Sequence, residues 1–159
     1  MELKFIDQTK NLFDSKKDIA EASDWTCTWI AAAMKGLQIK LLDTKGTSQF
    51  ADYILIATFQ NPTQANAMSQ QIVKTLKQFN VELRALEGQN DSDWILIDLH
   101  DVVVHLFSES ARALYALDEL LVAHKQVVIP QEFYTSSYDN KLDDVAISNK
   151  SAEDFKNYL

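Results

Sequence analysis

The chain is organised around the stretch Trp94-Ile-Leu-Ile-Asp-Leu-His-Asp-Val-Val-Val-His-Leu-Phe107. Two apolar runs of strand length, filled with Ile and Val, flank a polar break from Asp98 to Asp101. A turn at His100 and Asp101 would bring the two runs together as an antiparallel hairpin. We therefore predict a β-hairpin that the rest of the domain packs around.

The predicted hairpin has two unlike faces, because alternate residues of a strand point to opposite sides of the sheet. With a two-residue loop, one face pairs only apolar side chains: Leu99 with Val102, Ile97 with Val104, and Ile95 with Leu106. The other face pairs Asp98 with Val103, Leu96 with His105, and Trp94 with Phe107. The first face predicts hydrophobic core, and the mixed second face is a candidate for function.

The composition fits one globular domain with an acidic surface. The chain has 159 residues, of which 47% are hydrophobic and 24% charged, and its net charge is −8. A negative surface repels phosphate backbones, so we expect no direct recognition of nucleic acid and favour a basic protein as partner. We divide the chain into an N-terminal extension (1–22), a domain (23–124) and a polar C-terminal tail (125–159).

The sequence shows no pattern of export or membrane insertion. Its N-terminal residues lack the long apolar region of a signal peptide, and no apolar run reaches the ~18–20 residues that a membrane helix needs. Cys27 is the only cysteine, which excludes an internal disulfide and fits a reducing compartment. We expect a cytoplasmic protein with no membrane partner.

Apolar periodicity and capping residues predict three helices. Ser23 or Asp24 can cap the first, and Asn61 followed by Pro62 opens the second, which is cleanly amphipathic. The last begins at Ser108 or Glu109, with Leu114, Leu117 and Leu121 expected inward and Arg112 and Glu119 outward. Residues 1 to about 20 are either one amphipathic helix or a loose extension. We expect the polar tail to be partly disordered or draped on the domain, with a short helix near 151–158.

Strand patterns complete the predicted fold. Besides the two halves of the hairpin, apolar runs predict strands over 39–42, 53–59 and 81–86. A strand–helix–strand unit flanked by hairpins gives an α/β (α+β) domain with a mixed five-stranded sheet packed by helices.

Carboxylates near the hairpin suggest one enzymatic alternative. Asp91, Asp93, Asp98 and Asp101 are spaced acids near a strand, of the kind that hold Mg²⁺ in nucleotidyltransferases. Such enzymes also need a Gly-Ser element for phosphate, and this chain of three glycines supplies none. On the other interpretation Asp91 and Asp93 are solvated, and Asp98 and Asp101 fix the turn. We therefore expect no catalytic residues, no metal and no cofactor, and keep a metal-dependent nucleotidyltransferase-like enzyme using Asp93, Asp98 and Asp101 as the alternative.

Four other side chains are candidates for chemistry or binding. His100 and His105 would point to opposite faces of one extended strand, and Ser108 lacks the glycines of a nucleophile elbow. Trp94 has two open interpretations. It is either a residue that packs between sheet and helix or the anchor of a protein interface, where Trp is enriched.

A longer pattern runs from about Lys35 to Leu121. Its residues are, in order, Asp43, Ala51-Asp52-Tyr53, Ala57-Thr58, Gln64, Glu87-Gly88, Trp94, Asp98, Asp101-Val-Val-Val-His105, Phe107, Arg112, Tyr115 and Leu117. In this order and spacing they resemble the ribosomal silencing factor family, also called Iojap-like. The match is specific because all these short motifs occur together, whereas any one alone would be weak.

The resemblance implies a fold and a function. The fold would be a mixed sheet with helices, related to a degenerate nucleotidyltransferase fold that has lost catalysis. The function would be binding to a basic protein of the large ribosomal subunit at the intersubunit face, which blocks subunit joining and represses translation; a homodimer is possible in the free state. Carried over to this chain, the partner-binding residues would be Trp94, Leu96, Asp98, Leu99, His100 and Asp101.

The chain departs from the family pattern, most importantly in the turn. The Tyr-Gly-Asp of the family is Leu99-His100-Asp101 here, and histidine adopts positive φ less readily than glycine. Smaller departures are Phe59, Asn61, Asp118 and Leu121, where the family usually has Gly, Ser, Glu and a large aromatic residue. A third hypothesis, that the acidic tail binds an unrelated partner, is separable from the other two by truncation.

Overall fold

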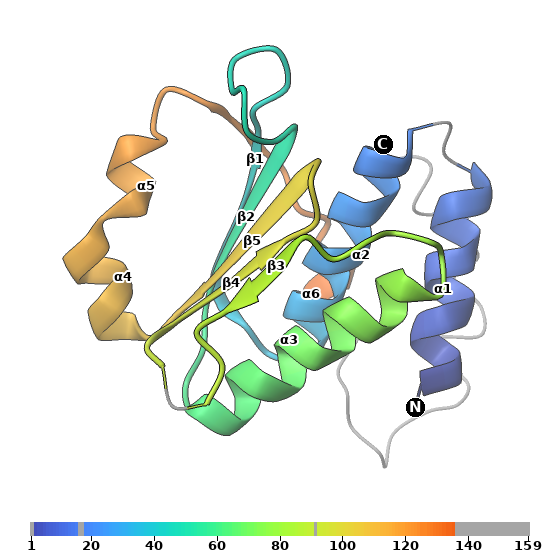
Figure 1. Cartoon of the computed structure of the whole chain (residues 1–159), viewed down its shortest axis with the longest axis horizontal. Helices are drawn as coiled ribbons and strands as arrows, with labels where there is room; N and C mark the ends of the chain where they lie inside the picture. The colour runs from blue at the N-terminus through green and yellow to red at the C-terminus, as the bar shows by residue number, and fades with distance from the viewer. Residues whose placement is uncertain (1, 16–17, 91, 136–159) are drawn as a thin grey trace.

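The computed structural model describes residues 2–15, 18–90 and 92–135 (Figure 1). Within them a six-stranded sheet lies between two layers of helices. The strands are β1 (Leu37–Asp43), β2 (Tyr53–Thr58), β3 (Ala85–Glu87), β4 (Trp94–Asp98), β5 (Val102–Phe107) and β6 (Lys125–Val127). The helices are α1 (Glu2–Ser15), α2 (Ile19–Ala33), α3 (Pro62–Lys77), α4 (Glu109–Tyr115), α5 (Leu117–Leu120) and α6 (Gln131–Thr135).

The sheet is mixed, as the sequence predicts. Its strand order is β3-β4-β5-β2-β1-β6, and only the β2–β5 pair is parallel. Helix α3 makes the crossover after β2, with Asn61 as its N-cap and Pro62 in its first turn, as predicted. Strand β3 is shorter and later than the predicted 81–86, and the sixth strand, β6, pairs with β1 at a place where no strand was predicted.

The hairpin has the predicted register. Trp94 pairs with Phe107, Leu96 with His105, and Asp98 with Val103. The Leu99 N–H donates to the Val102 carbonyl at 2.9 Å, so the loop consists of His100 and Asp101 alone. His100 has φ +69° and sits in a three-residue turn that the Asp101 N–H closes on the Leu99 carbonyl at 3.0 Å. The histidine therefore occupies the left-handed region that glycine enters without strain.

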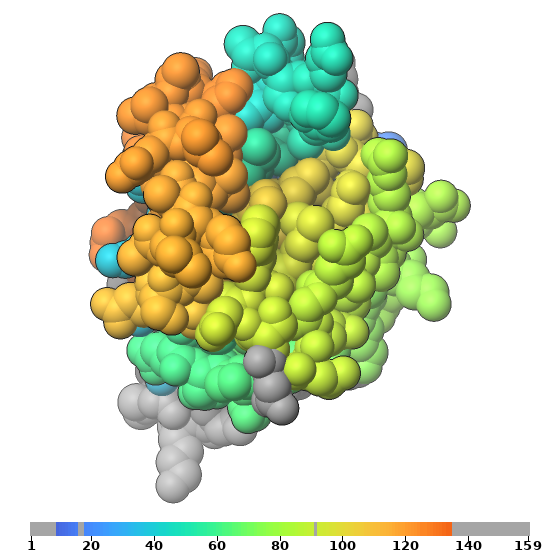
Figure 2. Space-filling model, turned by 60° about the vertical axis from the view of Figure 1, so that its left-hand side comes forward, coloured from blue at the N-terminus to red at the C-terminus, as the bar shows by residue number. Residues whose placement is uncertain are grey.

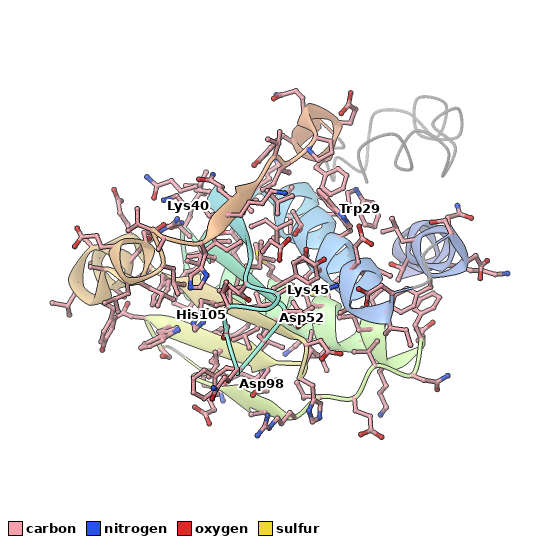
Figure 3. The ribbon with its side chains drawn as sticks, turned by 90° about the horizontal axis from the view of Figure 1, so that it is seen from above. Trp29, Lys40, Lys45, Asp52, Asp98 and His105 are labelled. Carbon is pink, nitrogen blue, oxygen red and sulfur yellow. The ribbon has the colours of Figure 1, made fainter. Side chains whose placement is uncertain are left out.

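Helices cover the two faces of the sheet unequally. Helices α1, α2, α3 and α6 lie on one side, the inner face, and α4 and α5 lie on the other (Figures 1 and 3). The inner side chains of the hairpin are all buried in the main core, as predicted; they are Ile95, Ile97, Leu99, Val102, Val104 and Leu106. A smaller apolar cluster under α4 and α5 includes Ile56, Phe107 and Ala111.

The start of α2 differs from the prediction. Asp18, in extended conformation, caps the helix by accepting the Ala20 N–H at 2.9 Å, whereas Ser23 and Asp24 lie inside the helix and are buried. The predicted start was too late because Ser23 and Asp24, which have good capping chemistry, lie within the helix. Asp24 Oδ1 has no hydrogen-bond partner among the described residues, and burial, with the charges of Glu21 and Asp43, raises the pKa of its carboxyl well above the usual range.

The helix predicted from Ser108 begins as expected, with Ser108 as N-cap, but breaks at Ala116, whose φ is +48°. The break divides it into α4 and α5 and rotates its faces. Leu117 and Leu121 pack inward as predicted, whereas Leu114 is 77% exposed and Arg112 only 8% exposed, so both of those orientations were wrong. A continuous helical period cannot be carried across a residue with left-handed backbone.

Arg112 holds the break in place. Its Nη1 donates to the Gln38 carbonyl at 2.6 Å and to the Thr58 hydroxyl at 3.0 Å. Its Nε and Nη2 donate to the two carboxylate oxygens of Asp118 at 3.0 and 2.9 Å. Lys40 lies 3.0 Å from the same carboxylate. The guanidinium thus ties the α4–α5 junction to β1 and β2, which is a reason for an arginine to be buried.

The described parts of both flanking segments pack on the domain. The N-terminal extension forms α1, and Phe13 of α1 stacks on Phe79 with ring centroids 4.8 Å apart. The first eleven residues of the predicted tail form β6 and α6, and Phe133 is fully buried with its ring edge against Trp25. The helix predicted near 151–158 lies outside the described residues. Among the described helices, none has the length and apolar character to cross a membrane.

Candidate functional site

The outer face of the sheet is only partly covered. Helices α4 and α5 pack over β1, β2 and the end of β5, while β3 and β4 are left uncovered beside them (Figure 2). The uncovered side chains alternate with the buried ones and are partly exposed. We call this surface the outer hairpin face and define it by Trp94, Leu96, Asp98, Val103 and His105.

Trp94 both packs and remains accessible. Its ring centroid lies 5.0 Å from that of Phe107, 4.8 Å from that of Tyr115 and 5.8 Å from that of His105. The side chain is half-buried, so one part of the ring supports the α4 contact and the rest faces outward. The two interpretations of the sequence are therefore compatible, since a Trp fixed by its neighbours is a rigid interface anchor.

His105 fixes the orientation of the Trp94 ring. The Trp94 indole Nε1–H donates to His105 Nδ1 at 3.2 Å, so Nδ1 must be unprotonated. Burial lowers the pKa of His105 to about 4, so the imidazole is neutral at physiological pH. The aromatic cluster on the outer hairpin face thus adds no positive charge there.

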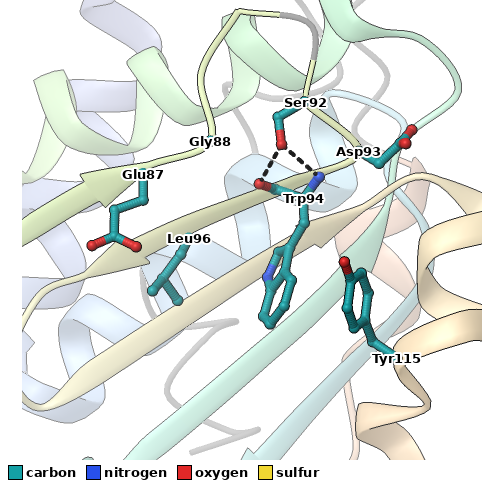
Figure 4. Close-up of a pocket in the computed structure, with 7 residues that line it drawn as sticks. All are labelled: Glu87, Gly88, Ser92, Asp93, Trp94, Leu96 and Tyr115. Atoms are coloured by element: carbon teal, nitrogen blue, oxygen red, sulfur yellow. Dashed lines mark hydrogen bonds between the residues drawn. The ribbon is translucent and has the colours of Figure 1, made fainter.

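A pocket of about 450 Å³ opens beside Trp94 (Figure 4). Its lining residues are Glu87, Gly88, Ser92, Asp93, Trp94, Leu96 and Tyr115. The Ser92 hydroxyl donates to the Trp94 carbonyl at 2.9 Å and accepts the Trp94 N–H at 3.1 Å, which folds the preceding loop against β4. Gly88, with φ +82°, lies so close to that carbonyl that a Cβ would be 1.9 Å from the oxygen. Only glycine fits there.

The hairpin tip is held by its own carboxylate. Asp98 Oδ1 accepts the His100 N–H at 2.9 Å, and its Oδ2 lies 3.9 Å from Arg84 Nε. The Asp101 carbonyl accepts the N–H groups of Asp52 and Tyr53 at 2.8 and 3.0 Å. His100 and Asp101 are exposed, whereas Leu99 is buried in the main core. Leu99 can support the turn but offers no surface to a partner.

The sequence matches the model of a known protein family over most of its length. The family model described as ribosomal silencing factor during starvation matches residues 17–157. The chain belongs to the ribosomal silencing factor family. The match spans the whole described fold except α1, so the sheet, the outer hairpin face and the pocket all fall within it.

Individual relatives agree with this assignment. The chain is 38% identical over 86 residues to the ribosomal silencing factor RsfS of Halalkalibacterium halodurans, which covers 54% of this chain and 74% of the relative. It is 31% identical to a mitochondrial Iojap-related protein of Arabidopsis thaliana, over 57% of this chain and 52% of the relative. A crystal structure from Bacillus halodurans matches with a TM-score of 0.55 and 33% identity, over 64% of this chain and 94% of that one. One from Chromobacterium violaceum matches with a TM-score of 0.56 and 28% identity, over 64% and 86%.

Membership of the silencing factor family places the chain among regulators named for an effect on the ribosome. The enzymatic alternative required Asp93, Asp98 and Asp101 to converge on one metal. In the described part of the chain, no three His, Cys, Asp or Glu side chains are grouped closely enough to hold an ion. Asp98 instead fixes the turn, as the non-enzymatic interpretation of the sequence predicted.

Four lining residues of the pocket were not predicted as site residues: Glu87, Gly88, Ser92 and Tyr115. Glu87 and Tyr115 belong to the family pattern, so a signal was present in the chain. The pattern did not show that Tyr115 and Trp94 are close in space. Tyr115 lies 21 residues beyond Trp94 and reaches it only through the packing of α4 on β5.

Proposed function

We propose that this protein acts in the cytoplasm as a ribosomal silencing factor, docking on a basic protein of the large subunit at its intersubunit face. Bound there, it blocks joining of the small subunit and represses translation. The observation that carries this proposal is Trp94, a rigid and partly exposed aromatic side chain on the uncovered part of the sheet. Such a residue next to a pocket is typical of an interface anchor.

Charge supports a basic partner. The chain carries a net charge of −8, and Glu87, Asp93 and Asp101 are exposed around the outer hairpin face. Complementary charge accelerates encounter and fixes register more than it adds affinity. In this proposal Trp94 and Leu96 provide the apolar centre of the interface, and Asp98, His100 and Asp101 provide its polar rim.

The test is cosedimentation of the full chain with separated large subunits, followed by a subunit-joining assay. The double variant Trp94→Ala with Asp98→Asn should lose binding, and asparagine keeps an oxygen that can accept the His100 N–H. The control is Ile19→Ala, an exposed apolar residue at the start of α2, on the opposite side of the sheet. Binding by the double variant at the wild-type level would refute the docking surface. Failure of the wild-type protein to bind would refute the function.

Self-association is a separate part of the proposal. Leu114, Leu120, Val122 and Val128 are exposed apolar side chains on or after α4 and α5, and they offer a surface to a second copy. Sedimentation equilibrium should show a dimer of the wild-type chain and a monomer of Leu120→Glu. A monomeric wild-type chain at micromolar concentration would refute the dimer and leave the docking surface unaffected.

A further inference from the structure

The pocket beside Trp94 has walls of two kinds, aromatic and acidic. Trp94 and Tyr115 supply the rings, Glu87 and Asp93 supply exposed carboxylates, and Leu96 supplies an apolar side chain. No lysine or arginine is among the lining residues. A pocket of about 450 Å³ is large enough for one long side chain.

The Trp94 ring has an acidic neighbour on one side and an aromatic one on the other. In Figure 4 the ring lies between Leu96 and Glu87 on one side and Tyr115 on the other, while the Asp93 carboxylate points away from it at the rim of the pocket. A cation above such a ring is attracted by its negative face when it lies within about 6 Å of the centroid. The Glu87 carboxylate adds a second attraction for a cation.

No positively charged side chain among the described neighbours offsets the negative charge of the pocket. His105, which touches the far side of the cluster, is neutral because its Nδ1 accepts the indole N–H and burial lowers its pKa to about 4. Arg84 lies across the sheet edge at 3.9 Å from Asp98 and does not line the pocket. The hydrogen bond from the Trp94 indole N–H to His105 holds the Trp94 ring in place before any ligand binds, which reduces the entropy lost on binding.

We propose that this pocket receives the guanidinium group of one arginine side chain of the docking partner. The proposal rests on the proposed function and names the contact that its acidic face makes. Arginine fits better than lysine, because a planar guanidinium can lie flat on the Trp94 ring while its fork pairs with the Glu87 carboxylate. A lysine ammonium would satisfy only the charge.

A peptide probe tests the pocket without the ribosome. The full chain, labelled with ¹⁵N, is titrated with acetyl-Gly-Arg-Gly-amide while the indole N–H signal of Trp94, assigned with Trp94→Phe, is followed. We expect a saturable shift of that signal, with a dissociation constant on the order of millimolar. The citrulline peptide, which is similar in shape but uncharged, should have no effect, and the lysine peptide should bind at least threefold more weakly.

Matched variants complete the test. Glu87→Gln should weaken the arginine peptide about tenfold, whereas Glu82→Gln, an exposed acid that does not line the pocket, should leave it unchanged. Equal binding of the citrulline peptide, equal binding of the lysine peptide or no shift at all would each overturn the arginine pocket.

The ribosome supplies the second readout. Glu87→Gln should also weaken cosedimentation with large subunits about tenfold relative to Glu82→Gln. Loss of peptide binding without loss of ribosome binding would overturn the assignment of the pocket to this partner. If the wild-type chain does not bind large subunits, the proposed function fails, while the peptide titration still decides whether the pocket takes arginine.

Discussion

Replacing Arg112 by methionine should lower the free energy of unfolding by about 3–4 kcal/mol at neutral pH. Methionine keeps an unbranched apolar stem but removes four hydrogen bonds, two to Asp118 and one each to the Gln38 carbonyl and the Thr58 hydroxyl. Removing one partner of a buried charge pair costs about 3–5 kcal/mol. The loss here belongs at the low end, because Asp118 keeps Lys40 at 3.0 Å.

The pKa of Asp118 gives a second route to the magnitude. The hydrogen bonds from Arg112 and then Lys40, working against burial, lower that pKa from 3.8 to about 2. Each tenfold change in proton affinity corresponds to about 1.4 kcal/mol, so Arg112 and Lys40 together stabilise the fold through this carboxylate by about 2.5 kcal/mol at pH 7, and Lys40 keeps its share in the variant. Leaving the Gln38 carbonyl and the Thr58 hydroxyl without their donor costs about 1 kcal/mol each, so the second route also gives about 3–4 kcal/mol.

The sign of the pH dependence follows from the lowered pKa. The folded state binds the Asp118 proton less readily than the unfolded state does. The stabilisation is therefore complete above the unfolded value near 3.8 and is lost as pH falls toward 2. The difference between the wild-type chain and Arg112→Met should be constant from pH 7 to pH 5 and should shrink between pH 4 and pH 3.

Urea denaturation followed by far-ultraviolet circular dichroism measures both quantities. Lys40→Met is the control, because Lys40 is largely exposed and a surface ion pair contributes about 1 kcal/mol or less. The reasoning would be refuted by an Arg112→Met protein within 1 kcal/mol of wild type at pH 7. It would equally be refuted by a difference that persists undiminished at pH 3.

Three further substitutions test other parts of the fold by the same assay. Asp24→Asn should stabilise the protein by about 1–3 kcal/mol at pH 7, because its raised pKa means that wild-type stability falls as pH rises above about 4; equal stability at pH 5 and pH 8 would contradict this. Phe133→Ala should cost about 3–4 kcal/mol, since the ring is fully buried against Trp25, and a loss under 1 kcal/mol would show that α6 does not belong to the core. His100→Gly should raise stability by up to about 1 kcal/mol by relieving the positive φ, and destabilisation would show that the imidazole itself holds the turn.

The sequence was most informative where one physical rule decided the outcome. In the hairpin, alternation with a period of two decides which side chains are buried, and a slip by one residue would expose Ile95 and Ile97. Asn61 and Pro62 decide the start of α3 in the same local way. At Asp18 and Asp24 two residues of good capping chemistry competed, and only the packing of α2 against its neighbours chose between them.

Elements that depend on distant partners were not predictable in this way. Strand β6 has three residues and exists because β1 offers it an edge, and Phe133 is buried because α2 presents Trp25. The burial of Arg112 required the left-handed backbone of Ala116, which no periodic pattern reveals. Truncation after Lys125 would therefore remove parts of the fold. To test the tail alone, the truncated chain should keep α6 and end at Thr135.

The Arg112 network also bears on the pocket, because Tyr115 is the last residue of α4 and stands directly before the break. Its ring forms one wall of the pocket and lies 4.8 Å from that of Trp94. Arg112 and Asp118 flank that position in sequence and tie the chain on both sides of it to β1 and β2. A helix that ran straight through Ala116 would carry these anchors to different places, so the break and its buried ion pair together set where the pocket wall stands. Arg112 is in this sense a positioning residue for the docking surface, although it lies under the α4–α5 junction beside that surface and does not line the pocket.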